Sequence, residues 1–152
     1  MYERILVPID GGTTANQGLK EAERVAQCHG SRIRVIHIVD ELPALEPSGG
    51  TGGGEFVMAK LRDIGASLLN SCVEEVRKAG LPVDSRLVEQ IGGRASDLIL
   101  QAALEFRADL IVCGTHGRTG LRRVALGSTA EEIVRRSNSP VLLVPPGAVK
   151  AP

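Results

Sequence analysis

A pattern of glycines and hydroxyl residues near the C-terminus is the part of this sequence best suited to chemistry. Its members are, in order, Gly114, Thr115, His116, Gly117 and, after nine intervening residues, Gly127 and Ser128. Gly114 follows an apolar run, where the missing side chain lets a ligand or another stretch of backbone approach closely. Gly127 precedes a predicted helix, whose free N–H groups and dipole favour an anion such as phosphate.

The same residues also have a purely structural interpretation. Ser128 and Glu131 have the spacing of a capping box, in which the Ser128 hydroxyl would satisfy only its own helix. Glycines near strand ends are common in turns. The spacing alone therefore leaves phosphate binding and helix capping open.

Several motifs of catalysis and metal binding are missing from the chain. There is no GxxxxGK[ST] loop, no GxGxxG after the first predicted strand, no GxSxG turn and no HExxH pair. The three cysteines, Cys28, Cys72 and Cys113, have neither CxxC spacing nor a matching histidine cluster, which is typical of reduced thiols in a cytoplasm. We expect no catalytic residue, no metal site made by protein side chains, and a cytoplasmic location.

The elements that must position these residues alternate along the chain. Apolar runs predict strands over residues 5–9, 33–39, 83–88, 110–113 and 141–144. Helical spacing predicts helices over residues 15–26, 56–79, 95–106 and 128–137. Gly30 and Gly80 are the expected stops of the first two helices. Such alternation predicts a mostly parallel sheet covered by helices.

Two of these elements carry a further expectation. The run over 83–88 alternates apolar and polar residues, as a half-exposed edge strand does. The longest helix is expected to face the core with an apolar stripe made by Val57, Leu61, Ile64, Leu68, Cys72 and Val76.

Residues 41–54 interrupt the alternation. They hold five glycines and two prolines and show no apolar period, which predicts a mobile loop at the carboxyl end of the second strand. The loop is either a tolerated surface insertion or a flap over a ligand, because ligands of open α/β sheets sit at the carboxyl ends of strands. The sequence does not separate the two.

Length and composition bound the function. The 152 residues suit one domain, and 18 basic side chains balance 18 acidic ones. This balance argues against nucleic acid and anionic membranes, which require a basic surface. No apolar run reaches the roughly 20 residues of a membrane span. With only Tyr2, Phe56 and Phe106 as aromatics, a bound purine must rest on aliphatic walls and backbone hydrogen bonds.

The residues from Gly114 to Val144, GTHGRTGLRRVALGSTAEEIVRRSNSPVLLV, closely resemble the C-terminal half of ATP-binding universal stress proteins, whose hallmark is G-x2-G-x9-G-[ST]. The segments ILVPIDGG and RVIHIVDE resemble the first two strands of that family. The resemblance covers residues 5–144. It implies an α/β fold of the adenine-nucleotide alpha-hydrolase kind: a single domain with an open five-stranded parallel sheet in the order 3-2-1-4-5 and helices on both faces. We expect the domain to span residues 1–147, with a tail at 148–152.

The resemblance also implies roles for single residues. Asp10 would accept hydrogen bonds from the ribose hydroxyls, Pro8 would lie beside the base, and the Ile38 backbone would pair with the adenine edge. The ribose and phosphates would be lined by Gly114, Thr115, His116 and Gly117. The phosphate oxygens would be held by Gly127, Ser128 and Thr129. The implied ligand is ATP, with Mg²⁺ a candidate to bridge its phosphates.

Other residues near the proposed site have more than one possible role. Gly12 stands where the family often has serine, which removes one hydroxyl. Asp10 could serve only an Asx turn, although its place at a strand end favours the ligand role. His37 is interpreted as a hydrogen-bonded core histidine, and Cys113 as a packed thiol. Three arginines near the glycine pattern, at 118, 122 and 123, are interpreted as a solvated loop rather than a triphosphate clamp.

Three functions compete. The preferred one is an ATP-binding regulatory module of the stress response. A slow ATPase on the same fold lacks a Walker lysine, paired acids and a convincing base. A member that binds another adenine nucleotide, or no nucleotide at all, is the remaining alternative. The wholly apolar strand 141–144 lies at the sheet edge in the implied order, which predicts a homodimer through that strand.

Overall fold

The computed structural model describes residues 1–40, 53–90, 92–116 and 126–148. Its elements are β1 (Arg4–Pro8), α1 (Thr13–His29), β2 (Arg32–Asp40), α3 (Gly53–Lys78), β3 (Val83–Gln90), α4 (Ala95–Phe106), β4 (Leu110–Gly114), α5 (Ser128–Arg136) and β5 (Val141–Val144). Each predicted strand and helix is present, with ends that shift by a few residues. No described helix is both long and apolar enough to cross a membrane.

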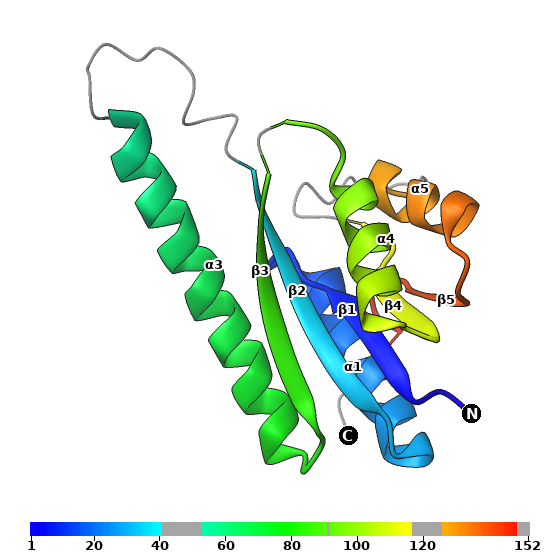
Figure 1. The fold of residues 1–152 in the computed structure, drawn as a ribbon. Helices are drawn as coiled ribbons and strands as arrows, with labels where there is room; N and C mark the ends of the chain where they lie inside the picture. The colour runs from blue at the N-terminus through cyan, green and yellow to red at the C-terminus, as the bar shows by residue number, and fades with distance from the viewer. Residues whose placement is uncertain (41–52, 91, 117–125, 149–152) are drawn as a thin grey trace.

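The five strands form one parallel sheet in the order β3-β2-β1-β4-β5, as predicted. Figure 1 shows the sheet edge-on between two layers of helices, with α1 and α3 on one face and α4 and α5 on the other. The carboxyl ends of β1 and β4, two neighbouring inner strands, therefore meet at one edge of the sheet.

Each face of the sheet has its own core. Ile5 and Val7 of β1 belong to the cluster under α1 and α3, whereas Leu6 belongs to the cluster under α4 and α5. All three side chains are 0% exposed. Full burial of an aliphatic side chain stabilises the fold by about 1.5–3 kcal/mol. The continuous apolar run of β1 is thus explained by a strand that is buried on both faces.

The predicted helix stops are glycines in the left-handed region. Gly30 has φ 69° and donates its amide to the Ala26 carbonyl, and Gly80 has φ 75°. This conformation is strained for residues with a Cβ, so both glycines end their helices as expected.

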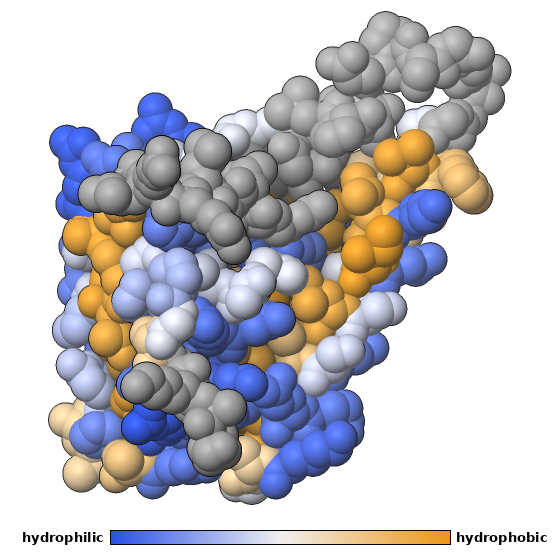
Figure 2. Space-filling model, turned by 180° about the vertical axis from the view of Figure 1, so that it is seen from behind, coloured by the Kyte–Doolittle hydropathy of each residue, from blue (hydrophilic) through white to orange (hydrophobic). Residues whose placement is uncertain are grey.

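Helix α3 departs from its expected position in two ways. It begins at Gly53, so Gly53 and Gly54, expected in the loop, form its first turn. The predicted core stripe is also partly wrong, because Val57 and Ile64 are 38% and 56% exposed. Figure 2, seen from behind Figure 1, shows apolar surface along this helix.

Val57 and Ile64 are exposed because α3 approaches the sheet closely at Gly65. A Cβ at this residue would lie 2.8 Å from side-chain atoms of His37 and Leu87. The helix must therefore turn Gly65 toward the strands. The face buried around it carries Met58, Leu69, Cys72, Val73 and Val76.

The two edge strands differ in how far they are buried. β3 is mostly half-buried or exposed, which confirms the predicted edge strand. β5 is the other edge, with Val141, Leu142 and Leu143 half-buried and Val144 only 2% exposed. The helices of the chain therefore leave part of this apolar strand uncovered.

Candidate functional site

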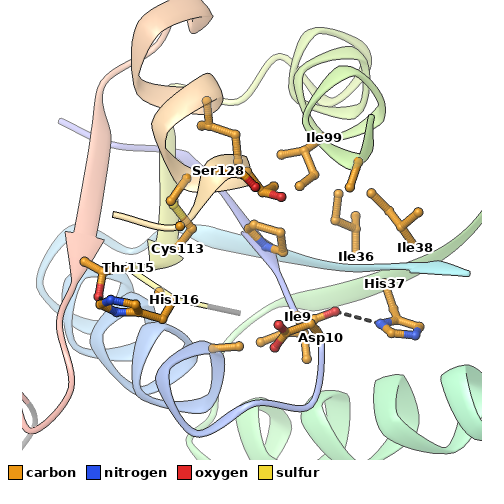
Figure 3. Close-up of a pocket in the computed structure, with 18 of the residues that line it drawn as sticks. Ile9, Asp10, Ile36, His37, Ile38, Ile99, Cys113, Thr115, His116 and Ser128 are labelled. Atoms are coloured by element: carbon orange, nitrogen blue, oxygen red, sulfur yellow. Dashed lines mark hydrogen bonds between the residues drawn. The ribbon is translucent and has the colours of Figure 1, made fainter. Parts of the chain in front are cut away.

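A pocket of about 460 Å³ opens at the carboxyl ends of β1, β2 and β4, on the face covered by α4 and α5 (Figure 3). Each predicted site residue that the structure describes lines this pocket: Pro8, Asp10, Ile38, Gly114, Thr115, His116, Gly127, Ser128 and Thr129. Gly117 lies outside the described residues, as do the three arginines at 118, 122 and 123. The fold thus brings together residues that are up to 121 positions apart.

One end of the pocket is apolar. Ile36 and Ile38 of β2 and Ile99 of α4 gather there in Figure 3, with Pro8 of β1 also lining the pocket. Side chains at this end offer no hydrogen-bonding group, so a flat apolar ring system would be held by aliphatic contact alone. Ile36 and Ile99 were not among the predicted site residues, because an isoleucine in a strand or helix signals only a core position.

Hydrogen bonding at this end comes from the backbone of Ile38. The ladder between β1 and β2 ends where the Ile9 amide donates to the Ile36 carbonyl at 2.8 Å. In a parallel ladder alternate residues point to the same neighbour, so the next groups to face β1 are the N–H and C=O of Ile38. β1 ends at Pro8, and among the described residues no hydrogen bond takes up these two groups. A donor and an acceptor therefore stand side by side at the pocket wall.

The N-terminus of α5 forms a polar end. Gly127 is the N-cap, with φ −61° and ψ 143°, and no side chain of the described ranges caps the helix. Ser128 is the first helical residue rather than the cap, so the capping-box interpretation of Ser128 is wrong. Its hydroxyl and that of Thr129 are exposed at the pocket. The first amides of a helix have no internal partner, and with the helix dipole they favour an anion.

Asp10 lies in the turn between β1 and α1. Its Oδ1 accepts a 2.8 Å hydrogen bond from the Gly12 amide, which makes an Asx turn. The neighbouring Ile9 carbonyl accepts a 2.7 Å hydrogen bond from His37 Nδ1, as predicted for a hydrogen-bonded histidine. The predicted core position is wrong, because His37 is half-buried and lines the pocket. The Asx turn does not use the second carboxylate oxygen, which no described residue engages. The turn and a ligand role for Asp10 are therefore compatible.

Gly114 is a glycine for a different reason than its place in the pocket suggests. A Cβ there would lie 2.7 to 2.9 Å from the backbone and side chain of Thr14 in α1. The close approach is thus made by a helix, one of the two alternatives that the sequence allowed. The buried Thr14 hydroxyl also donates to the His116 carbonyl, which fixes the chain just after β4.

Thr115 and His116 face a different part of the pocket from the isoleucines (Figure 3). The Thr115 hydroxyl and the His116 Nδ1 are 2.9 Å apart and hydrogen-bonded. The other ring nitrogen, Nε2, is buried and has no hydrogen-bond partner among the described residues. The Thr115 hydroxyl and Nδ1 are thus engaged with each other, whereas Nε2 stays available.

Other residues that line the pocket were not predicted as site residues, among them Gly93, Ala95 and Cys113. Gly93, with φ 96°, comes from the turn between β3 and α4, and Ala95 is the first residue of α4. The glycine pair at 92 and 93, directly after a predicted strand, was the signal that could have found them. Cys113 lines the wall next to α5 and is 4% exposed, and burial raises the pKa of its thiol to about 11. The thiol is therefore protonated at neutral pH, as expected of a packed cysteine.

No three histidine, cysteine or acidic side chains come together as metal ligands within the described ranges. Asp10 is the single carboxylate among the described residues that line the pocket. The arrangement consists of an apolar end with a backbone donor and acceptor, a carboxylate in a turn, and an uncapped helix N-terminus. It suits a ligand with a ring system at one end and an anion at the other.

Known proteins are similar to this chain in sequence and in fold. The profile of the Universal stress protein family matches residues 1–145. A universal stress protein of Thermus aquaticus, from the QAH/OAS sulfhydrylase 3′ region, is 34% identical over 144 residues, which cover 95% of this chain and 99% of that protein. Among solved structures, hypothetical protein MJ0577 of Methanocaldococcus jannaschii has a TM-score of 0.82 at 26% identity, covering 100% of this chain and 99% of the other.

A second solved structure is informative because of its ligand. A universal stress protein from Archaeoglobus fulgidus in complex with dAMP has a TM-score of 0.65 and 27% identity, covering 94% of this chain and 98% of that one. Together with the profile match over nearly the whole chain, these relatives agree with the fold and with the resemblance seen in the sequence. The chain belongs to the universal stress protein family.

Proposed function

We propose that this protein is an ATP-binding regulatory module of the stress response, which works by binding nucleotide rather than by catalysis. The observation that carries the proposal is that one pocket holds two complementary features. At one end the N–H and C=O of Ile38 have no hydrogen-bond partner among the described residues, and at the other end lies the N-terminus of α5, which no described side chain caps. The pocket volume of about 460 Å³ lies within the range of small-molecule sites.

The adenine base would lie at the apolar end. Its exocyclic amine and ring nitrogen present a donor beside an acceptor, which complements the C=O and N–H of Ile38. Ile36 and Ile99 supply the aliphatic contact that replaces aromatic stacking, and Pro8 lies beside the base. Asp10 would accept hydrogen bonds from the ribose.

The phosphates would extend toward α5. Gly127 leaves room for an oxygen to approach the first helical amides, and Ser128 and Thr129 add hydroxyl donors. Gly117, predicted to line the same region, remains part of the proposal. Mg²⁺, where present, would bridge phosphate oxygens, because the described pocket residues supply only one carboxylate.

A second candidate is an adenine monophosphate. The Archaeoglobus fulgidus neighbour was solved with dAMP, and a monophosphate needs only the helix N-terminus as its anion site. Both candidates use the same base and sugar contacts. They differ in whether residues beyond the first turn of α5 contribute to affinity.

Two further properties belong to this proposal. We place the protein in the cytoplasm, where its three free cysteines stay reduced. We also propose a homodimer through β5, whose edge carries three half-buried apolar side chains, Val141, Leu142 and Leu143. The domain is proposed to end near residue 147, before a short tail.

The decisive experiment is mass spectrometry of the denatured, gently purified protein. Co-purified ATP, or another adenine nucleotide, is the expected result. Calorimetry with ATP, ADP and AMP then ranks the candidates. Hydrolysis is expected below about one turnover per minute, far from the enzyme median of about 10 s⁻¹. Failure of all three nucleotides to bind at millimolar concentration contradicts the proposal.

A further inference from the structure

The outward face of α3 carries apolar side chains that no other described part of the chain covers. α3 packs on β2 and β3, and Figure 1 shows it as the outermost element on its side of the sheet. Phe56, Val57 and Ile64, all in the first half of this helix, are 72%, 38% and 56% exposed. Apolar side chains gathered in this way are typical of an interaction surface.

Two opposite charges lie among these apolar side chains. Lys60 and Asp63 are exposed, and neither forms an ion pair with another described residue. Their neighbour Arg62 differs, because it pairs with Glu89 of β3 at 2.8 Å and so belongs to the contact between α3 and the sheet. The outward face thus offers one cation and one anion, which a partner with the opposite arrangement of charges would complement.

Helical spacing makes this face complementary to itself. Phe56, Lys60, Asp63 and Ser67 recur at intervals of four, three and four residues, so they lie on one side of α3. Two antiparallel copies of the helix, related by a two-fold axis midway between Lys60 and Asp63, place Lys60 of each copy opposite Asp63 of the other. The same axis places Phe56 opposite Ser67, a large side chain against a small one.

The residues that flank this row also match in the antiparallel arrangement. On one side of the row Val57 comes to lie beside Ile64 of the second copy, so that both lose exposed apolar surface. On the other side Ala59 lies beside Ala66, and these exposed small residues let the two helices approach closely. A second copy of the chain therefore supplies the opposite charges and the apolar surface at the same time.

We propose that the outward face of α3 binds the same face of a second copy of this chain, with the helices antiparallel and Lys60 paired with Asp63 of the second copy. This inference goes beyond the proposed nucleotide binding and does not depend on it. Because β3 and β5 lie at opposite edges of the sheet, the contact can coexist with the proposed contact through β5. Two such self-complementary contacts join dimers into a closed tetramer or an open chain.

The test isolates this contact in Leu143→Lys, the full-length variant expected to lack the contact through β5. The α3 contact is small and has charges at its centre, so we expect a dissociation constant on the order of hundreds of micromolar. The mass measured by small-angle X-ray scattering should rise from that of a monomer toward that of a dimer as the concentration approaches about 1 mM. Where Leu143→Lys does not fold, the wild type and its charge variants are measured in the same way.

Charge variants test the pairing of the two helices. Lys60→Glu and Asp63→Lys each bring like charges together, and each should weaken association about tenfold or more. The double variant exchanges the charges and should recover the dissociation constant to within about threefold. Lys78→Glu is the matched control, because it makes the same change in net charge at an exposed position of α3 outside the contact. It should associate as its parent does.

Phe56→Ser tests the apolar part of the contact. Removal of the ring should weaken association about tenfold, whereas the free energy of unfolding should not change, because the side chain is already exposed. Circular dichroism and urea unfolding check this. Phe56 does not line the nucleotide pocket, so ATP affinity should also stay as it is.

The outcomes separate this inference from the proposed function. A Leu143→Lys variant that stays monomeric at about 1 mM overturns the inference. Association that survives Lys60→Glu overturns it, and so does association that both single variants lose and the double variant does not recover. Association that depends on Phe56 but not on the charges indicates another partner surface and also overturns it. A protein that associates in this way but does not bind ATP overturns the proposed function alone.

Discussion

The amide of Gly127 donates a 2.8 Å hydrogen bond to the carbonyl of Thr115, and so ties the N-cap of α5 to the residue that follows β4. The Thr115 amide in turn donates to the carbonyl of Val144, the last residue of β5, at 3.1 Å. Three elements are therefore joined at the polar end of the pocket by main-chain bonds. Side chains at this end remain available for a ligand.

The first prediction concerns that polar end. Ser128→Ala removes a hydroxyl that caps nothing, so ATP affinity should fall about tenfold while stability is unchanged. Gly127→Val should weaken binding by more, because its side chain would stand where phosphate approaches the helix amides. The backbone of Gly127, at φ −61°, accepts valine without strain. Calorimetry with ATP gives the affinities.

The matched control is Ser67→Ala, on an exposed part of α3 far along the chain from the pocket residues. It should bind ATP as the wild type does. Native circular dichroism of Ser128→Ala and Gly127→Val, together with undiminished ATP affinity, would contradict the placement of phosphate at α5.

The second prediction separates two glycines that face each other between α1 and β4. A Cβ at Gly114 would lie 2.7 Å from the Thr14 backbone, whereas one at Gly18 would meet nothing closer than 3.4 Å. Gly114→Ala should therefore lower the free energy of unfolding by about 1–3 kcal/mol through overpacking. Gly18→Ala should be neutral or stabilising by up to about 1 kcal/mol, because alanine favours a helix. Urea unfolding of both variants measures the difference, and equal stabilities would refute the packing role of Gly114.

Local patterns predicted the strands and helices of the sheet, whereas its strand order and the roles of most pocket residues came from the resemblance to the family. Apolar runs that end at Asp10 and Gly114 mark the carboxyl ends of neighbouring strands, and the fold brings these ends together. The roles that the sequence did not predict depend on tertiary contacts. Only the packing of α1 shows that Gly114 accommodates Thr14. The resemblance to the family already implied a role for the Ile38 backbone, and the end of β1 adds that its N–H and C=O have no partner among the described residues.

The stripe of α3 illustrates the same limit. Helical periodicity allows several adjacent faces in an amphipathic helix, and the sequence pattern favoured the one with Val57 and Ile64. In the structure a different face is buried, because the missing side chain of Gly65 lets the helix approach His37 and Leu87. A glycine in the middle of a helix signals such an approach, but its partner is visible only in three dimensions.

The third prediction concerns Glu23 on α1. Burial, followed by the nearby charge of Glu75, raises the pKa of its carboxyl, which Lys20 only partly opposes. The folded protein thus binds this proton more tightly than the unfolded chain. The ionised group destabilises the fold, and this cost grows as pH rises from the unfolded value through the folded pKa.

Glu23→Gln should consequently be more stable than the wild type at pH 7, and the gain should vanish below about pH 4, where both states are protonated. Urea unfolding at the two pH values checks this. Glu74→Gln, an exposed neighbour that pairs with Arg77, serves as the control and should show no such gain. A Glu23→Gln variant that is no more stable at pH 7 would show that the site is well solvated.

The last prediction concerns the edge strand β5. Val144 is already buried at 2% exposure, so a partner would cover chiefly Val141, Leu142 and Leu143. Leu143 belongs to neither core cluster, unlike Leu142 and Val141, which pack against one each. A charge at Leu143 should therefore break a dimer without unfolding the protomer, because lysine cannot be buried unpaired in an apolar contact. Sedimentation at tens of micromolar should show a wild-type dimer and a Leu143→Lys monomer. Leu104→Lys, on α4 where the side chain is 64% exposed, should stay dimeric. A wild type that sediments as a 16.1 kDa monomer would refute the dimer.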